Sequence, residues 1–99
     1  MVEIVEMLAP MHPGEMLREE FLLPLGLSRG KVATAAGVPR TRIERLVQEK
    51  SGITADTALR LAKVFNTTPE FWMNLQARHD ILIARAATSL DEVRTLRVA

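Results

Sequence analysis

The chain has 99 residues, of which 47% are hydrophobic and 25% are charged, and its formal net charge is +1. This composition is typical of one ordinary globular domain, and no apolar run approaches the roughly eighteen residues needed to span a membrane. The N-terminal segment contains Glu3 and Glu6 where a signal peptide would carry basic residues. Because the chain has no cysteine, disulfides and thiolate metal sites are excluded, and we expect a cytoplasmic protein.

The first part of the chain is predicted to be an arm followed by a helix. Residues 1–11 have no helical periodicity, so we predict an N-terminal arm there. A helix is expected from His12 to about Leu22, because a proline and then an acidic residue occupy its first turn. Pro24 should end this helix, and Ser28 is a good N-cap for the next one.

Two short amphipathic helices with a tight turn between them are predicted within residues 29–49. Apolar or small side chains recur there at helical spacing, at Val32, Ala33, Ala36, Val38, Ile43, Leu46 and Val47. Gly37 should end the first helix, because glycine adopts the left-handed conformation without steric cost. Pro39 should open the second helix, where a backbone N–H would have no intrahelical partner. This pattern is typical of a helix-turn-helix, whose second helix enters the major groove of DNA.

Two more helices are expected, over residues 55–65 and from Pro69 to about Ala87. Thr54 and Thr68 directly precede them, and threonine is a favoured N-cap residue. The first of the two should turn its apolar set inward, at Ala58, Leu59, Leu61, Ala62 and Phe65. The chain is therefore predicted to be all-α, with five helices in a lambda-repressor-like arrangement and the helix-turn-helix at helices 2 and 3.

The last of these helices carries more apolar surface than a five-helix core should cover. The side chains concerned are Trp72, Leu75, Ile81, Leu82 and Ile83. Because apolar patches of this kind usually mark partner surfaces, we predict a symmetric homodimer that pairs through this helix and the tail. The predicted organisation is an arm (1–11), a helix-turn-helix domain (12–88) and a C-terminal tail (89–99).

Positive charge is concentrated around the predicted helix-turn-helix. Residues 28–50 sum to +4, whereas residues 1–27 sum to −4 and residues 51–99 to +1. The six basic side chains are Arg29, Lys31, Arg40, Arg42, Arg45 and Lys50. A phosphate-binding face requires such localisation. The alternative from pattern alone is an ordinary solvated arginine face on a helical domain that binds no DNA.

No catalytic constellation is evident in the sequence. His12 and His79 are far apart along the chain, and His12 is expected to cap a helix or face solvent. His79 and Asp80 are adjacent on a predicted helix, where neighbouring side chains do not face each other. The five glycines do not form a phosphate-binding loop. We therefore predict a binding protein and not an enzyme, with no cofactor and no metal.

Three stretches of the chain resemble a known family: HPGEMLREEFLLPLGLS, GVPRTRI and GITADTALRLAKVFNTTPEFWMNLQ. They are similar to the HigA-type (VapI-type) antitoxins, which are XRE-type, lambda-repressor-like helix-turn-helix proteins. The resemblance covers roughly residues 12–88 and implies five helices and usually a homodimer. It also implies double-stranded operator DNA as one partner and a small HigB-like toxin, a RelE-like ribosome-dependent mRNA interferase, as the other. Such an antitoxin neutralises the toxin and represses the shared operon.

The resemblance also implies roles for the basic side chains. Arg40 and Thr41 match the first exposed positions of the recognition helix, and Arg45 lies one turn further, so these three are the predicted base readers. Arginine suits guanine because its planar fork donates two parallel hydrogen bonds. The predicted DNA-backbone contacts are Arg29, Lys31, Arg42 and Lys50.

Some residues depart from the family pattern. Gln48-Glu49-Lys50 stands where the family often has Asn-Gly-Lys, and Glu49 brings a negative charge near the DNA backbone. Pro39 replaces a capping Ser or Thr, and His79-Asp80-Ile81 replaces Tyr-Asp-Leu. Two alternatives therefore stay open. One is a toxin-holding module without operator binding, and the other is a stand-alone XRE-type regulator.

Overall fold

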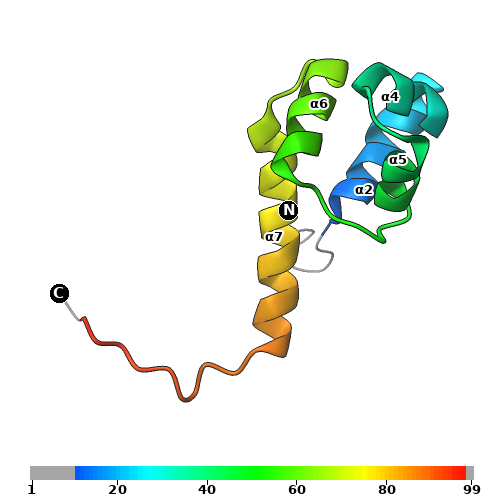
Figure 1. The fold of residues 1–99 in the computed structure, drawn as a ribbon. Coiled ribbons are helices and arrows are strands. Elements are labelled where there is room, and N and C mark those ends of the chain that lie inside the picture. Colours follow the sequence, from blue (N-terminus) through cyan, green and yellow to red (C-terminus); the bar gives the residue numbers. More distant parts are fainter. Residues whose placement is uncertain (1–10, 98–99) are drawn as a thin grey trace.

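The computed structural model describes residues 11–97, and this part of the chain is helical, with no strand (Figure 1). The elements are α2 (Pro13–Met16), η1 (Leu17–Leu22), α3 (Leu23–Leu25), α4 (Arg29–Ala36), α5 (Arg40–Val47), α6 (Ala55–Phe65) and α7 (Pro69–Ala87). Because α2, η1 and α3 follow one another without a break, they form one continuous helix. The five-helix, all-α prediction is therefore confirmed, while the predicted arm lies outside the described residues except for its last position.

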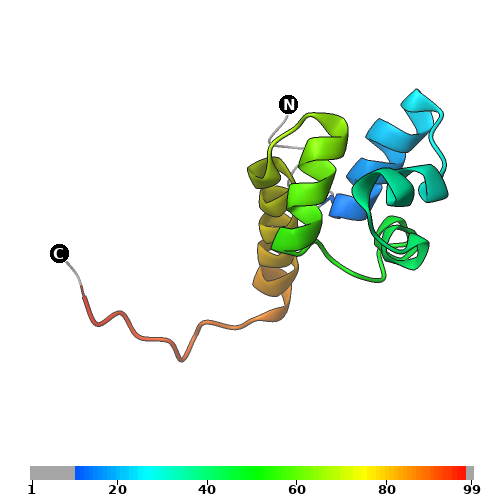
Figure 2. The ribbon, with the colours of Figure 1, turned by 45° about the horizontal axis from the view of Figure 1, so that its top comes forward.

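The helices form a body from which α7 projects. α6 packs against both α7 and α4, while α2 packs against α5 and α7. The C-terminal part of α7 stands clear of the other helices, and the chain after it runs away from the body (Figures 1 and 2). The exposed end of the molecule is thus α7 with the following segment, well separated from α4 and α5.

The first helix does not end where its proline predicts. It continues to Leu25, and η1 is wound as a π-helix, in which the Leu23 N–H bonds to the Arg18 carbonyl five residues earlier. A proline has no N–H to donate, and its ring crowds the carbonyl four residues before it. The wider π spacing lets Pro24 remain inside the helix. Gly26, with a φ of 63°, then ends the helix in the left-handed conformation.

The predicted caps of the later helices are confirmed. Ser28, Thr54 and Thr68 each accept a hydrogen bond from the backbone N–H three residues on, at 3.1 to 3.3 Å. Gly37 and Asn66 end α4 and α6 in the left-handed conformation, with φ values of 70° and 55°. These local interactions set where each helix begins and ends, and so they set the order of the elements.

Trp72 lies at the centre of the core. Its side chain is fully buried, and its indole Nε1 donates to the Thr67 hydroxyl at 2.8 Å. Three phenylalanine rings surround it with centroids 5.0 to 6.4 Å away, namely Phe21, Phe65 and Phe71. The assignment of Trp72 to a dimer interface is therefore wrong, because this ring is already covered by its own chain. Leu75 also packs against this core and is partly buried.

One leucine of α6 faces outward, contrary to prediction. Leu59 is 61% exposed, whereas Ala58, Leu61 and Ala62 are buried. Successive residues of an α-helix are turned by about 100°, so Leu59 lies well to one side of the face that its three neighbours share. Its apolar character alone did not place it in the core.

The two histidines of the chain meet in the fold. His12 is buried and caps α2, since its Nδ1 accepts from the Gly14 N–H at 2.9 Å. Its ring packs edge-to-face on His79, with the centroids 4.9 Å apart. His79 Nδ1 lies 3.5 Å from the Asp80 carboxylate without a hydrogen bond, so these neighbours come closer than predicted but form no general-base pair. Burial, and next the proximity of His79, lower the pKa of His12 below its usual value near 6.5.

This lowered pKa predicts that acid destabilises the fold through His12. Because the unfolded chain binds the proton more readily than the folded one, the contribution is complete above about pH 6.5 and is lost as the pH falls through the folded value. His12→Asn retains an oxygen acceptor for the Gly14 N–H and removes the titration. Urea unfolding at about pH 7.5 and 5.5 should show a larger loss of stability for the wild type than for the variant. Equal losses would contradict the assignment.

Candidate nucleic-acid interface

The candidate interface is built on α5, which has one buried and one exposed face. Its buried side chains are Ile43, Leu46 and Val47, as predicted. α4 packs against this helix, and Ala33, buried on α4, keeps the contact close because its side chain is small. Pro39 is the N-cap and not the first helical residue, so α5 begins one residue later than predicted and has no capping hydroxyl.

The outer face of α5 carries the predicted base readers. Arg40, Thr41 and Arg45 are all exposed, as is Arg42. The predicted DNA-backbone residues are Arg29, Lys31, Arg42 and Lys50. Lys31 and Lys50 are also exposed, whereas Arg29 is half-buried at the start of α4. The fold thus gathers the base-reading set on one solvent-facing helix surface. Their contacts with bases and phosphates stay predictions.

Each arginine of α5 has a partner within the chain. Arg40 Nε lies 2.8 Å from Glu44 Oε2, one helical turn away. Arg45 Nη2 reaches the Lys50 carbonyl at 3.5 Å. Ion pairs on an exposed surface contribute little to stability, so phosphate or base acceptors can replace these partners at small cost.

Two residues of α6 are linked to Arg42 of the candidate interface, although the sequence did not single them out. Arg42 Nη1 lies 2.6 Å from the Asp56 carboxylate, and Arg60 Nε lies 3.0 Å from the same oxygen. Hydrogen bonds from Arg42 and then Arg60 lower the pKa of Asp56. The sequence alone indicates only that Asp56 is an acidic residue in the first turn of a helix. Its contact with Arg42 could not be predicted, because the two residues are fourteen positions apart.

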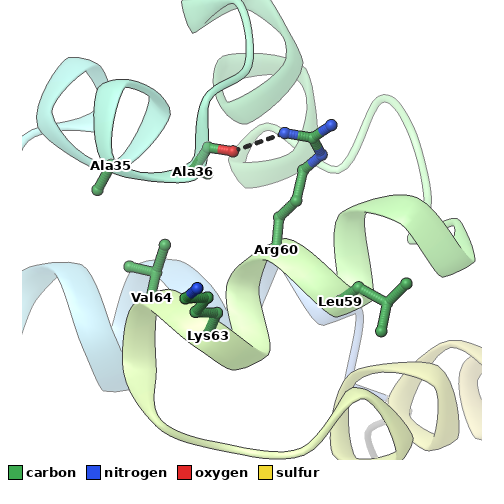
Figure 3. Close-up of a pocket in the computed structure, with 6 residues that line it drawn as sticks. All are labelled: Ala35, Ala36, Leu59, Arg60, Lys63 and Val64. Carbon is green, nitrogen blue, oxygen red and sulfur yellow. Dashed lines mark hydrogen bonds between the residues drawn. The ribbon is translucent and has the colours of Figure 1, made fainter.

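Arg60 connects α6 to the end of α4. Its Nη1 donates to the Ala36 carbonyl at 2.9 Å (Figure 3). The same atom also donates to the Gly37 carbonyl at 3.2 Å. These carbonyls belong to the last residue and the C-cap of α4, where no intrahelical donor remains. Arg60 therefore caps α4 and fixes the turn that leads into α5.

A shallow groove lies between α4 and α6 beside Arg60 (Figure 3). Its volume is about 440 Å³, and its lining is Ala35, Ala36, Leu59, Arg60, Lys63 and Val64. The lining has one arginine and one lysine, and it has no histidine, serine or carboxylate from which a catalytic pair could be built. Elsewhere in residues 11–97 no cluster of three or more His, Asp or Glu side chains could hold a metal ion. In the same part of the chain, no helix is both long and apolar enough to cross a bilayer.

Glu49, which lies two residues after α5 and departs from the family pattern, has an unusual backbone conformation. Glu49 has a φ of 60°, a left-handed conformation that costs a residue with a Cβ about 1–2 kcal/mol. This explains why glycine suits the position. The Glu49 carboxylate is turned toward the first helix, with Oε2 3.4 Å from Arg18 Nη2. Its negative charge is therefore partly compensated within the chain.

The geometry defines a helix-turn-helix protein with an exposed basic second helix, and comparisons with known proteins agree. The helix-turn-helix family matches residues 17–72. Virulence-associated protein I of Dichelobacter nodosus is 49% identical over 73 residues, which cover 74% of this chain and 68% of that protein.

Two solved structures are similar along nearly the whole chain. The Pseudomonas aeruginosa antitoxin HigA with the higBA promoter has a TM-score of 0.84 and 37% identity, covering 91% of this chain and 100% of that one. The antitoxin GraA in complex with its operator has a TM-score of 0.82 and 40% identity, covering 92% and 94%. The chain belongs to the HigA-type (VapI-type) antitoxins of the XRE-type helix-turn-helix family.

Proposed function

We propose that this protein is the antitoxin of a type II toxin–antitoxin module. It binds operator DNA as a homodimer, represses its own operon and neutralises a HigB-like mRNA interferase toxin. The observation that carries the proposal is the exposed arginine surface of α5, held by a buried face on a helix-turn-helix. Support comes from similar proteins whose structures contain promoter or operator DNA. Residues 12–88 are the proposed binding domain, between the arm and the tail.

In this proposal α5 lies in the major groove. Arg40, Thr41 and Arg45 read base edges, because they occupy the exposed face near the N-terminal half of a recognition helix and one turn further along it. The backbone contacts are Arg29, Lys31, Arg42 and Lys50, whose charges neutralise phosphates and release counterions. The base contacts supply sequence preference, and the phosphate contacts supply most of the salt-dependent affinity.

Alanine substitution separates these two roles. Arg40→Ala or Arg45→Ala should weaken operator binding by about 1–3 kcal/mol per half-site and relax the preference for one base. Arg29→Ala should weaken all sequences alike and flatten the plot of log K against log salt by about one unit. The measurement is a salt titration of each variant on DNA upstream of the gene and on scrambled DNA.

Lys63→Ala is the matched control for this titration, because it removes an exposed positive charge from α6 beside the groove and not from α5. It should leave the preference for the upstream DNA unchanged. If the wild type binds both DNAs equally at every salt concentration, the repressor half of the proposal is wrong. The remaining reading is then a toxin-holding module without operator binding.

Apolar side chains at the projecting end of the molecule support the homodimer. Ile81 and Ile83 on α7 are 50% and 52% exposed. A groove of about 300 Å³ lies beside Ile81, and its lining is Ile81, Ala84, Arg85, Thr88 and Leu90. Two leucines and a valine of the tail are exposed as well, namely Leu90, Val93 and Leu96. Together with Leu75 and Leu82, which are only partly buried, these residues form the surface that we assign to a second copy of the chain.

Charge placed on this surface should separate the dimer. The wild type should sediment as a dimer at micromolar concentration, and Ile81→Glu should sediment as a monomer with unchanged helix content, because a carboxylate would be buried without a partner. Leu59→Glu is the matched control, since Leu59 is similarly exposed but lies on α6. It should remain a dimer. A monomeric wild type would contradict the assignment.

The toxin half of the proposal rests on the family to which the chain belongs. A short reading frame for a small basic protein beside the gene would support it, and growth rescue on co-expression of the two proteins is its test. The stand-alone regulator is the alternative that such a neighbour would exclude.

A further inference from the structure

Asp56 joins the proposed DNA-binding helix to the helix behind it. Its Oδ2 lies 2.6 Å from Arg42 Nη1 on α5 and 3.0 Å from Arg60 Nε on α6. Arg60 is in turn held by the carbonyls of Ala36 and Gly37 at the end of α4. Asp56 is therefore held by Arg60 of its own helix, and among residues 11–97 its partner on α5 is Arg42.

This arrangement changes the charge that α5 offers to DNA. Arg42, Asp56 and Arg60 together carry a net charge of +1, although two of the three side chains are cationic. The Asp56 side chain is 55% exposed and the Arg42 side chain is 42% exposed, so both can face an approaching phosphate. A carboxylate there competes with phosphate oxygens for the same guanidinium N–H groups.

Such competition acts differently on specific and non-specific DNA. Non-specific binding is essentially electrostatic, because it depends on neutralised phosphates and released counterions. A carboxylate that is bonded to Arg42 therefore directly lowers the affinity for non-specific DNA. On an operator, base contacts fix the register, and an arginine that is already oriented loses less side-chain freedom when it meets its phosphate. On the operator, this smaller loss of side-chain freedom offsets part of the electrostatic penalty that the carboxylate imposes. On other sequences the penalty is not offset.

We propose that Asp56 is a specificity-determining residue that acts through Arg42, lowering non-specific DNA binding more than operator binding. This inference rests on the operator binding proposed above. Asp56 is a positioning residue in this role, because it is argued to act on DNA through the arginine and not by a contact of its own.

The test is Asp56→Asn, measured by salt titration on the upstream DNA and on scrambled DNA. Near 0.1 M salt the variant should bind scrambled DNA roughly three- to tenfold more tightly, and its plot of log K against log salt should be steeper by about one unit. Binding to the upstream DNA should rise less, so the ratio of the two affinities should fall. Asp56→Glu, which keeps the charge, should retain the wild-type slope.

Glu70→Gln is the matched control. Glu70 is exposed in the first turn of α7, as Asp56 is in the first turn of α6, so both substitutions remove one negative charge from the same place in a helix. The control should change the affinity ratio less than Asp56→Asn does. In an Arg42→Ala background, Asp56→Asn should have no larger effect than the control, since the residue through which it acts is gone.

The outcomes separate this inference from the proposed function. If the wild type prefers the upstream DNA but Asp56→Asn behaves like Glu70→Gln, the inference about Asp56 is wrong and operator binding stands. The inference also fails if Asp56→Asn keeps its full effect without Arg42. If the wild type shows no preference between the two DNAs, both the repressor proposal and this inference are overturned.

Discussion

The burial of one face of α5 is the interaction on which the rest of the structure depends. Ile43, Leu46 and Val47 are at most 1% exposed, and they fix the rotation of the helix about its own axis. Because that rotation is fixed, the polar residues between them must point to solvent. Gly37 and Arg60 set the turn before the helix, the glycine by its left-handed backbone and the arginine by bonding the last carbonyls of α4. The basic surface is thus a consequence of how the core is packed.

The arginines of the same surface are paired within the chain and remain accessible to DNA. Its arginines bond to glutamate, aspartate and backbone carbonyl groups that are themselves exposed or half-exposed. Such pairs contribute little to folding, so exchange for phosphates or bases costs little stability. Arg18 and Glu49 show a related arrangement beside α5. Hydrogen bonds that Arg18 donates to the carboxylates of Glu19 and Glu49 raise the pKa of Arg18. The ion pair with Arg18 partly compensates the Glu49 charge near the proposed DNA backbone path.

Local signals made most of the fold predictable. The caps at Ser28, Thr54 and Thr68 depend on one side chain and a backbone group three residues away, so the sequence determines them directly. Features that depend on contacts between residues far apart in the sequence were either not predicted or predicted wrongly. Trp72 was assigned to a partner surface because neither the aromatic cluster around it nor its bond to Thr67 is visible in one helical pattern. Asp56 was not singled out for the same reason, since its role follows from two arginines on different helices.

The central claim is that α5 reads base edges in the major groove as one half of a symmetric pair. Methylation interference tests it most directly, because a methyl group on guanine N7 blocks the atom to which an arginine fork bonds. On the DNA upstream of the gene, the account predicts that methylated guanines interfere with binding in two clusters about one helical turn apart, which is roughly 34–36 Å. Binding that persists unchanged when every guanine N7 is methylated would contradict the account.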